Sequence, residues 1–355
     1  MRRDKVLRRN TGSRSPSLES DVMKQASSPF IPSRYSLASI AGVTLVELMV
    51  SLAIGSFLMI GAMQIYNQSR QAYVINDSIA RVQETAQFAM DTIEADLRMA
   101  SNYGLSSRGD AVEGRSVTGD ANPNGLTLPA PNCGADWALN LSRPVQGSNN
   151  AYTLLCAAQL GAQPNSDVVT IRRASVAPVA PLPGRLQIQS TRIQGEILDD
   201  GIMPTGFDLL TSQTHNLLVH SYYVAADSAL IPGVPTLRRK TLGINGGAPA
   251  VTDIEIAPGV ENLQVQFGID MNADKSVDRY VNPGDPILDP TSGGWIPAAK
   301  VITARIWIVV RSLSPEMGIV DRTDYEPGDV DLGVPNDDYR RMIVSKTILL
   351  RNSRI

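Results

Sequence analysis

Ala41-Gly42-Val43-Thr44-Leu45-Val46-Glu47-Leu48 opens an uncharged, apolar run that continues from Leu48 to Ser69. As a helix rising about 1.5 Å per residue, that run reaches roughly 33 Å and is long enough to cross a bilayer. Glu47 is out of place there, because a carboxylate at the bilayer centre costs about 2.5–3.5 kcal/mol and less near the edge. The sequence therefore predicts a membrane-spanning helix whose acidic group has a function or a partner.

The same stretch resembles the class III signal of type IV prepilins, in which an apolar run with one glutamate follows a glycine. The resemblance implies that a prepilin peptidase cuts between Gly42 and Val43 and methylates the new amino terminus. It also implies that the Glu47 carboxylate pairs with the terminal ammonium of a neighbouring subunit. The alternative is a plain single-pass anchor with an interfacial glutamate. Members usually have Phe or Met where this chain has Val43.

The residues before Val43 predict the orientation. They carry eight basic and three acidic side chains, which favours a cytoplasmic location under the positive-inside rule. A secretory signal peptide is excluded, because its cleavage site follows the apolar run instead of preceding it. We expect a single pass through the inner membrane, with the N-terminus cytoplasmic and the head periplasmic, and later incorporation into an extracellular pilus. The leader is long for a prepilin, and a start at Met23 is the alternative to Met1.

The charge balance argues against nucleic acid as a partner. The full sequence has 32 basic and 35 acidic residues, and 24 basic and 32 acidic residues remain without the leader. The resulting net charge of about −8 disfavours non-specific electrostatic binding of DNA. Arg172-Arg173, Arg238-Arg239-Lys240 and Arg340-Arg341 are candidate local patches, although such groups on strands are more typical of a solvated face.

A long helix should continue beyond the membrane, since no proline occurs between Pro32 and Pro123. Apolar side chains recur in steps of three and four at Ile75, Ile79, Val82, Ala86, Ala89, Ile93 and Leu97. Glu94 and Arg98 form a favourable i, i+4 pair, and Gly104 offers a stop. We expect one helix from Val43 to about Ala100, whose stripe from Ile79 to Leu97 packs on its own domain.

The rest of the chain predicts a β-rich head. Residues 105–165 are rich in turn formers, and short β-type runs follow at 167–173, 185–193, 216–225, 236–242, 252–256, 263–269, 301–310 and 342–350. Leu263, Val265, Phe267 and Ile269 alternate with polar residues, which indicates an antiparallel sheet with one wet face. The fold class is therefore α+β: a leader (1–42), a long helix (43–103, transmembrane over about 43–69) packed on the sheet, and a periplasmic head (104–355) with loop-rich insertions.

Several head segments resemble the PilW family of minor pilins. They are Ser69–Tyr73, Asp96–Ala100, Glu261–Asp270, Asp278–Tyr280, Ala304–Arg311, Arg340–Arg341 and Leu350–Asn352. The J-type pseudopilins of type II secretion share the N-terminal signal, but their heads are typically shorter.

Cys133 and Cys156 are the only cysteines. In an oxidising periplasm they predict one disulfide, which would contribute roughly 3 kcal/mol by closing a loop. Two buried free thiols are the alternative.

One loop is a candidate calcium site. Asp270, Asn272, Asp274, Ser276 and Asp278 stand at alternate positions, the spacing with which a calcium loop presents oxygen ligands. Against this, Lys275 occupies the position where such loops need glycine, and Val281 the position of the bidentate glutamate. A polar turn between two strands is the alternative.

Catalysis has little support. His215 and His220, the only histidines, lie beside a β-run without a cysteine or paired acid at zinc-ligand spacing, and no nucleophile or phosphate-loop motif occurs. We therefore do not expect an enzyme.

We interpret the chain as a minor pilin, which is a priming or tip subunit of a type IV pilus. Its expected partners are other minor pilins, the major pilin, the prepilin peptidase, the inner-membrane assembly platform and a tip adhesin. The alternatives are an adhesive, surface-binding module at the pilus tip and a type II secretion pseudopilin.

Overall fold

The computed structural model describes residues 42–117, 122 and 124–354. Its first element is the helix α1 (Leu45–Met99), close to the expected bounds. The chain divides into two compact units between Gln64 and Ile65, so the second half of α1 is grouped with the head. The leader, residues 1–41 of the expected 1–42, lies outside the described residues apart from Gly42.

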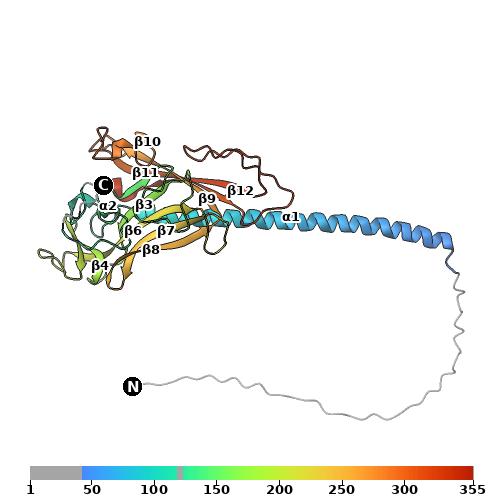
Figure 1. The fold of residues 1–355 in the computed structure, drawn as a ribbon, viewed down its shortest axis with the longest axis horizontal. Helices are drawn as coiled ribbons and strands as arrows, with labels where there is room; N and C mark the ends of the chain where they lie inside the picture. Colours follow the sequence, from blue (N-terminus) through green and yellow to red (C-terminus); the bar gives the residue numbers. More distant parts are fainter. Residues whose placement is uncertain (1–41, 118–121, 123, 355) are drawn as a thin grey trace, which may run out of the picture. The chain divides into compact units, whose positions relative to one another are not determined.

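The head holds two sheets instead of the single one expected (Figure 1). The eight-stranded sheet comprises β1 (Val112–Glu113), β2 (Val145–Ser148), β3 (Val168–Ala174), β4 (Pro183–Ser190), β5 (Gly195–Asp200), β6 (Gln213–Ala225), β7 (Thr236–Asn245) and β8 (Ala248–Pro258). The four-stranded sheet comprises β9 (Val260–Asp270), β10 (Arg279–Val281), β11 (Lys300–Arg311) and β12 (Arg341–Leu349). Pairing is antiparallel except between β1 and β5, so the first sheet is mixed.

The strand order explains how distant segments meet. In the first sheet the order is β1-β5-β4-β6-β3-β2, with β7 beside β6 and β8 beside β7, and in the second it is β10-β9-β11-β12. Gly259 joins β8 to β9 with φ of +92°, and a Cβ there would lie 2.9 Å from the Arg311 carbonyl oxygen, so this turn requires glycine.

Four strands and a helix were missing from the prediction. They are β1, β2, β5, β10 and the helix α2 (Ala135–Leu139), besides three short 3-10 turns at Gly109–Ala111, Pro286–Leu288 and Arg351–Arg354. Most of these elements are too short to display a period in the sequence. They form because neighbouring segments supply hydrogen-bond partners, as β5 does for β1.

The helical stripe packs as predicted for its second half. Val82, Ala86, Ala89, Ile93 and Leu97 are buried in one cluster with side chains of β9, β11 and β12. Ile75 is exposed and Ile79 is half-buried, so the packed stripe begins at Ile79, as expected.

The expected wet face of β9 is covered. Gln264 is fully buried, because residues 312–340, the connection between β11 and β12, lie across this face. A Cβ on Gly328 in that connection would lie 2.9 Å from Gln264 and 3.6 Å from Trp307. Arg341 fixes its end through ion pairs with Glu261 and Asp337.

Asp96 joins α1 to the first sheet. Its carboxylate accepts hydrogen bonds from Arg173 on β3 (2.8 Å) and from His220 Nδ1 (2.5 Å) and the Tyr222 hydroxyl (2.6 Å) on β6. Burial raises the pKa of Asp96, but the hydrogen bond and charge of His220, the Tyr222 hydroxyl and the Arg173 charge outweigh it and hold the pKa well below its usual range. The ionised carboxylate is thus part of the folded structure.

We predict that Asp96→Asn destabilises the head by about 3 kcal/mol, because it leaves the partly buried Arg173 charge without its partner. A lowered folded-state pKa gives stability that is present above the ordinary carboxyl pKa of about 3.9 and is lost as pH falls below it. Urea unfolding of the detergent-solubilised chain at several pH values measures both effects. Asp77→Asn, which removes an exposed pair with Arg81, is the control and should change stability by at most about 0.5 kcal/mol. Equal effects of the two substitutions would contradict the role of Asp96.

Candidate functional site

Thr44 sets the start of α1. Its hydroxyl accepts a hydrogen bond from the Glu47 backbone N–H at 3.2 Å, and its carbonyl oxygen accepts the first helical bond, from Leu48. Thr44 and Glu47 stand at the Thr-x-x-Glu spacing of a capping box, and a carboxylate in the first turn is favoured by the helix dipole. Sequence reasoning missed this cap, although the spacing of the two residues could have revealed it.

The first part of α1 is exposed among the residues that the structure describes. Side chains from Val43 to Tyr66 are almost all exposed, including Phe57 and Met59, and the helix is long and apolar enough to cross a membrane by length and composition. Nothing lies within 4 Å of a Cβ added to Gly55 or Gly61, so packing within the chain does not explain these glycines. No ion pair in the described part of the chain involves Glu47.

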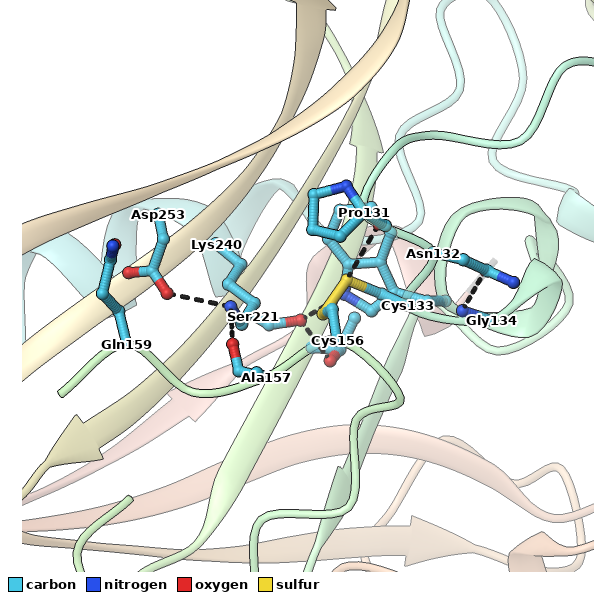
Figure 2. Close-up of a disulfide and its surroundings, with 12 residues drawn as sticks. Pro131, Asn132, Cys133, Gly134, Cys156, Ala157, Gln159, Ser221, Lys240 and Asp253 are labelled. Atoms are coloured by element: carbon cyan, nitrogen blue, oxygen red, sulfur yellow. Dashed lines mark hydrogen bonds and ion pairs between the residues drawn. A yellow bond between two sulfur atoms is a disulfide. The ribbon is translucent and has the colours of Figure 1, made fainter. Parts of the chain in front are cut away.

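Cys133 and Cys156 form the predicted disulfide, with their Cα atoms 4.5 Å apart (Figure 2). The bond links the segment before α2 to the loop between β2 and β3. Lys240 holds the same loop from β7, because its ammonium donates to the Ala157 carbonyl oxygen and pairs with Asp253, both at 2.8 Å (Figure 2). The loop between β2 and β3 is therefore held in two ways, by the disulfide to the segment before α2 and by Lys240 to β7.

The basic groups that suggested a solvated face or a patch are largely buried. Arg238 pairs with Asp253 and Glu255, Lys240 with Asp253, and Arg341 with Glu261 and Asp337. Arg172 is 1% exposed and donates only to neutral acceptors. The interpretation as a solvated face is wrong for Arg172, Arg238 and Lys240. Arg172 donates to carbonyl oxygens near α2, and the neighbouring strand β8 supplies the carboxylates for Arg238 and Lys240.

Both histidines serve the packing of the head. His220 binds Asp96, and the His215 Nδ1 lies 2.8 Å from the Ser175 carbonyl oxygen. Within residues 42–117, 122 and 124–354, no group of three or more His, Cys, Asp or Glu residues is arranged to hold a metal.

The candidate calcium loop forms a hydrogen-bonded turn between β9 and β10. Asp270 accepts backbone N–H groups of Ala273 (2.7 Å) and Lys275 (2.8 Å), and Asp278 accepts that of Met271 (2.6 Å). Further bonds link Asn272, Asp274 and Ser276 to one another. The five predicted residues are thus brought together, while their oxygens already have protein donors.

Comparisons with known proteins agree with these features. Residues 37–63 match the family model of the prokaryotic N-terminal methylation motif, and residues 221–352 match that of the type IV pilus-assembly protein W, PilW. The second match covers the end of β6, β7 to β12 and the last 3-10 turn. No curated protein matches the chain.

A solved structure, the type IV-like pilin TTHA1219 from Thermus thermophilus, aligns with 78% of this chain and 99% of its own at 13% identity and a TM-score of 0.33. That similarity is too low to support an argument.

The methylation motif covers the start of α1, and the PilW match covers the second sheet, which packs on the buried stripe of that helix. A methylation motif over residues 37–63, a PilW domain over residues 221–352, a long apolar helix and a disulfide-linked β head occur in one chain, and together they support a PilW-like minor pilin of type IV pilus assembly.

Proposed function

We propose that the chain is a prepilin that is cut between Gly42 and Val43, methylated at Val43 and held in the inner membrane by the first part of α1. The observation that carries this proposal is the methylation motif over residues 37–63, which ends inside an apolar helix whose side chains there are exposed in the described part of the chain. The N-terminus lies in the cytoplasm and the head in the periplasm, since basic residues predominate before Val43.

Within the pilus, we assign the protein to a priming or tip complex. The exposed apolar half of α1 supplies contacts to the helices of other minor pilins and of the major pilin, with Gly55 and Gly61 allowing close approach. The head selects neighbours, and the peptidase, the assembly platform and a tip adhesin complete the partners. A role as a type II secretion pseudopilin is the alternative, and the PilW match favours the pilus.

An adhesive function of the tip is the second candidate. It draws on the loop between β5 and β6, where Leu209 and Leu210 are 77% and 91% exposed. Apolar side chains displayed this fully in a loop are typical of contact surfaces.

Glu47 has two roles that can be separated. Its backbone N–H is capped by Thr44, and its carboxylate has no basic partner among the described residues. Because an unpaired charge in hydrocarbon is costly, assembly that brings the ammonium of a neighbour to Glu47 gains the energy of neutralisation. The cap orients the helix start, while the charge drives assembly.

We expect the membrane form of the protein to begin with N-methylated Val43. Gly42→Arg should leave the leader attached, because the small residue before the cut is lost. Mass spectrometry of the N-terminal peptide measures both forms. A membrane protein that retains Met1 or Met23 as its terminus would contradict processing.

Glu47→Gln should reduce incorporation into pili at least tenfold with unchanged insertion, because glutamine can serve in a capping box but cannot neutralise an ammonium. Thr44→Val is the matched control: it removes the capping hydroxyl, keeps the carboxylate and should still be incorporated. Quantitative immunoblotting of sheared pili and membranes measures the distribution. If the control fails and Glu47→Gln succeeds, capping is the function of this pair.

Calcium binding by the loop of Asp270, Asn272, Asp274, Ser276 and Asp278 remains a proposal. If it occurs, Ca²⁺ should raise the melting temperature of the full chain more than Mg²⁺ does, since Mg²⁺ retains its waters. Asp274→Ala should remove the gain, and Asp285→Ala, outside the loop, should not. Calorimetry without saturable Ca²⁺ binding at millimolar concentration would leave a polar turn.

A further inference from the structure

The strand β12 forms one edge of the four-stranded sheet, with β11 on one side and no strand of the described residues on the other. Its pairing with β11 runs without a register shift over all nine residues, from Arg341 to Leu349. Proteins commonly interrupt an exposed edge with a bulge, a proline or charged side chains, because such an edge is a template for another strand. β12 therefore offers a straight and uninterrupted edge.

The register shows which backbone groups face the open side of β12. The Leu350 N–H donates to the Ile302 carbonyl oxygen and the Ser312 N–H to that of Arg340, both in line with the β11–β12 register. Because bonded and non-bonded pairs alternate along an antiparallel ladder, the even-numbered residues of β12 bond to β11. Those that direct an N–H and a C=O to the open side are Ile343, Ser345, Thr347 and Leu349. These groups have no hydrogen-bond partner in the described part of the chain.

The side chains along this edge suit a further strand. Those of the four odd-numbered residues are uncharged and exposed. On the opposite face, Met342 and Val344 are only half-buried against the core of the head. Lys346, the one charged residue between 342 and 349, pairs with Glu94 of α1. An added strand would pair the free backbone groups and complete the burial of Met342 and Val344.

The other long edge, β8 of the first sheet, is protected. A register shift next to Arg238 interrupts its pairing with β7, and its Val251 N–H already donates to the Ala130 carbonyl oxygen. It also carries two carboxylates, Asp253 and Glu255, which pair with Arg238. The remaining edges in the described residues, β1, β2 and β10, have at most four residues each. β12 is therefore the edge with the longest free ladder.

The direction of β12 argues against a second copy of this chain as its partner. Before β12, Glu316 binds both Arg340 and the Ser78 hydroxyl, and after β12, Asn352 donates to the Ala100 carbonyl oxygen at 3.1 Å. β12 thus runs in the same direction as this part of α1. Antiparallel pairing of two β12 strands would reverse one α1 helix relative to the other, whereas copies anchored in one membrane have parallel helices.

We propose that the β12 edge binds an extended, antiparallel strand from the head of a different membrane-anchored pilin. The added strand spans residues 343–349, with apolar side chains toward Met342 and Val344. The opposite edge of the sheet, β10, runs antiparallel to β12, so a head in the same orientation presents an edge with the required direction. In this chain β10 has only three residues, and the partner needs a longer strand. This inference rests on the proposed role in pilus assembly and specifies how the head meets a neighbour.

Hydrogen exchange at residue resolution tests the edge in the full chain, both alone in detergent and in a complex with other pilins isolated from membranes. In the chain alone, the odd-numbered amides of residues 343–349 should exchange at least tenfold faster than the even-numbered ones, which bond to β11. In the complex the odd-numbered amides should slow at least tenfold. The even-numbered amides are the internal reference.

Thr347→Pro removes one outward N–H at an edge, where strands tolerate proline. It should leave the melting temperature of the chain nearly unchanged and reduce its incorporation into the complex at least tenfold. Thr347→Val is the matched control, because it keeps both the N–H and a β-branched side chain, and it should be incorporated like the unmodified chain. The exchange measurement decides the test if Thr347→Pro does not fold.

The inference is overturned if the odd-numbered amides stay fast in the complex, or if folded Thr347→Pro is incorporated as well as Thr347→Val. A Ser345→Cys chain that cross-links to itself in oxidised membranes would identify a second copy at this edge and overturn it too. A chain that forms no complex with other pilins overturns the proposed function together with this inference, whereas a complex with fast odd-numbered amides overturns the inference alone.

Discussion

The ionised carboxylate of Asp96 is the interaction on which the head depends. It lies on the face of α1 that enters the core, and it receives hydrogen bonds from β3 and β6. Hydrophobic burial holds the helix against the sheets but has no direction. The hydrogen bonds of Asp96 are directional, and they fix the rotation and depth of α1 relative to the first sheet. Every contact of the helix stripe follows from that placement.

Buried charge is also how the irregular part of the head is organised. Residues 105–165 contain little regular structure, yet Arg172 holds the carbonyl oxygens around α2, and Lys240 holds the loop after Cys156. Arg172 supplies several donors to the segment around α2, and Lys240 supplies one to the Ala157 carbonyl oxygen. The disulfide cross-links two segments of the same region covalently. A loop-rich insertion therefore becomes a fixed surface with a preformed hollow.

The sequence predicted what local pattern and covalent chemistry determine. The apolar run, the stripe from Val82 to Leu97 and the alternation in β9 have periods that a single segment displays, and two cysteines allow one pairing. The burial of Arg172 and Arg238 could not be predicted, because their partners lie elsewhere in the chain. The cover over Gln264 was missed for the same reason: residues 312–340 show no period, and their position depends on Arg341.

At the processing signal, the order of Gly42, Val43 and Glu47 is informative because these residues are close together in the sequence. A pocket of about 220 Å³ beside Cys133 is the opposite case. It is made from four segments, and one of its lining residues, Arg172, stands on a strand between Ile171 and Arg173. Only the fold shows that one of two adjacent arginines lines the pocket while the other reaches Asp96.

The position of β12 has a consequence for biogenesis. This last strand pairs with β11 across the long connection of residues 312–340, and Ile348 and Leu350 complete the core that contains the α1 stripe. Asn352 then bonds the Ala100 carbonyl oxygen at 3.1 Å. Contacts between the two ends of a chain form late, because they close the largest loops. The cover of the helix stripe is thus incomplete until β12 has been synthesised and has paired with β11.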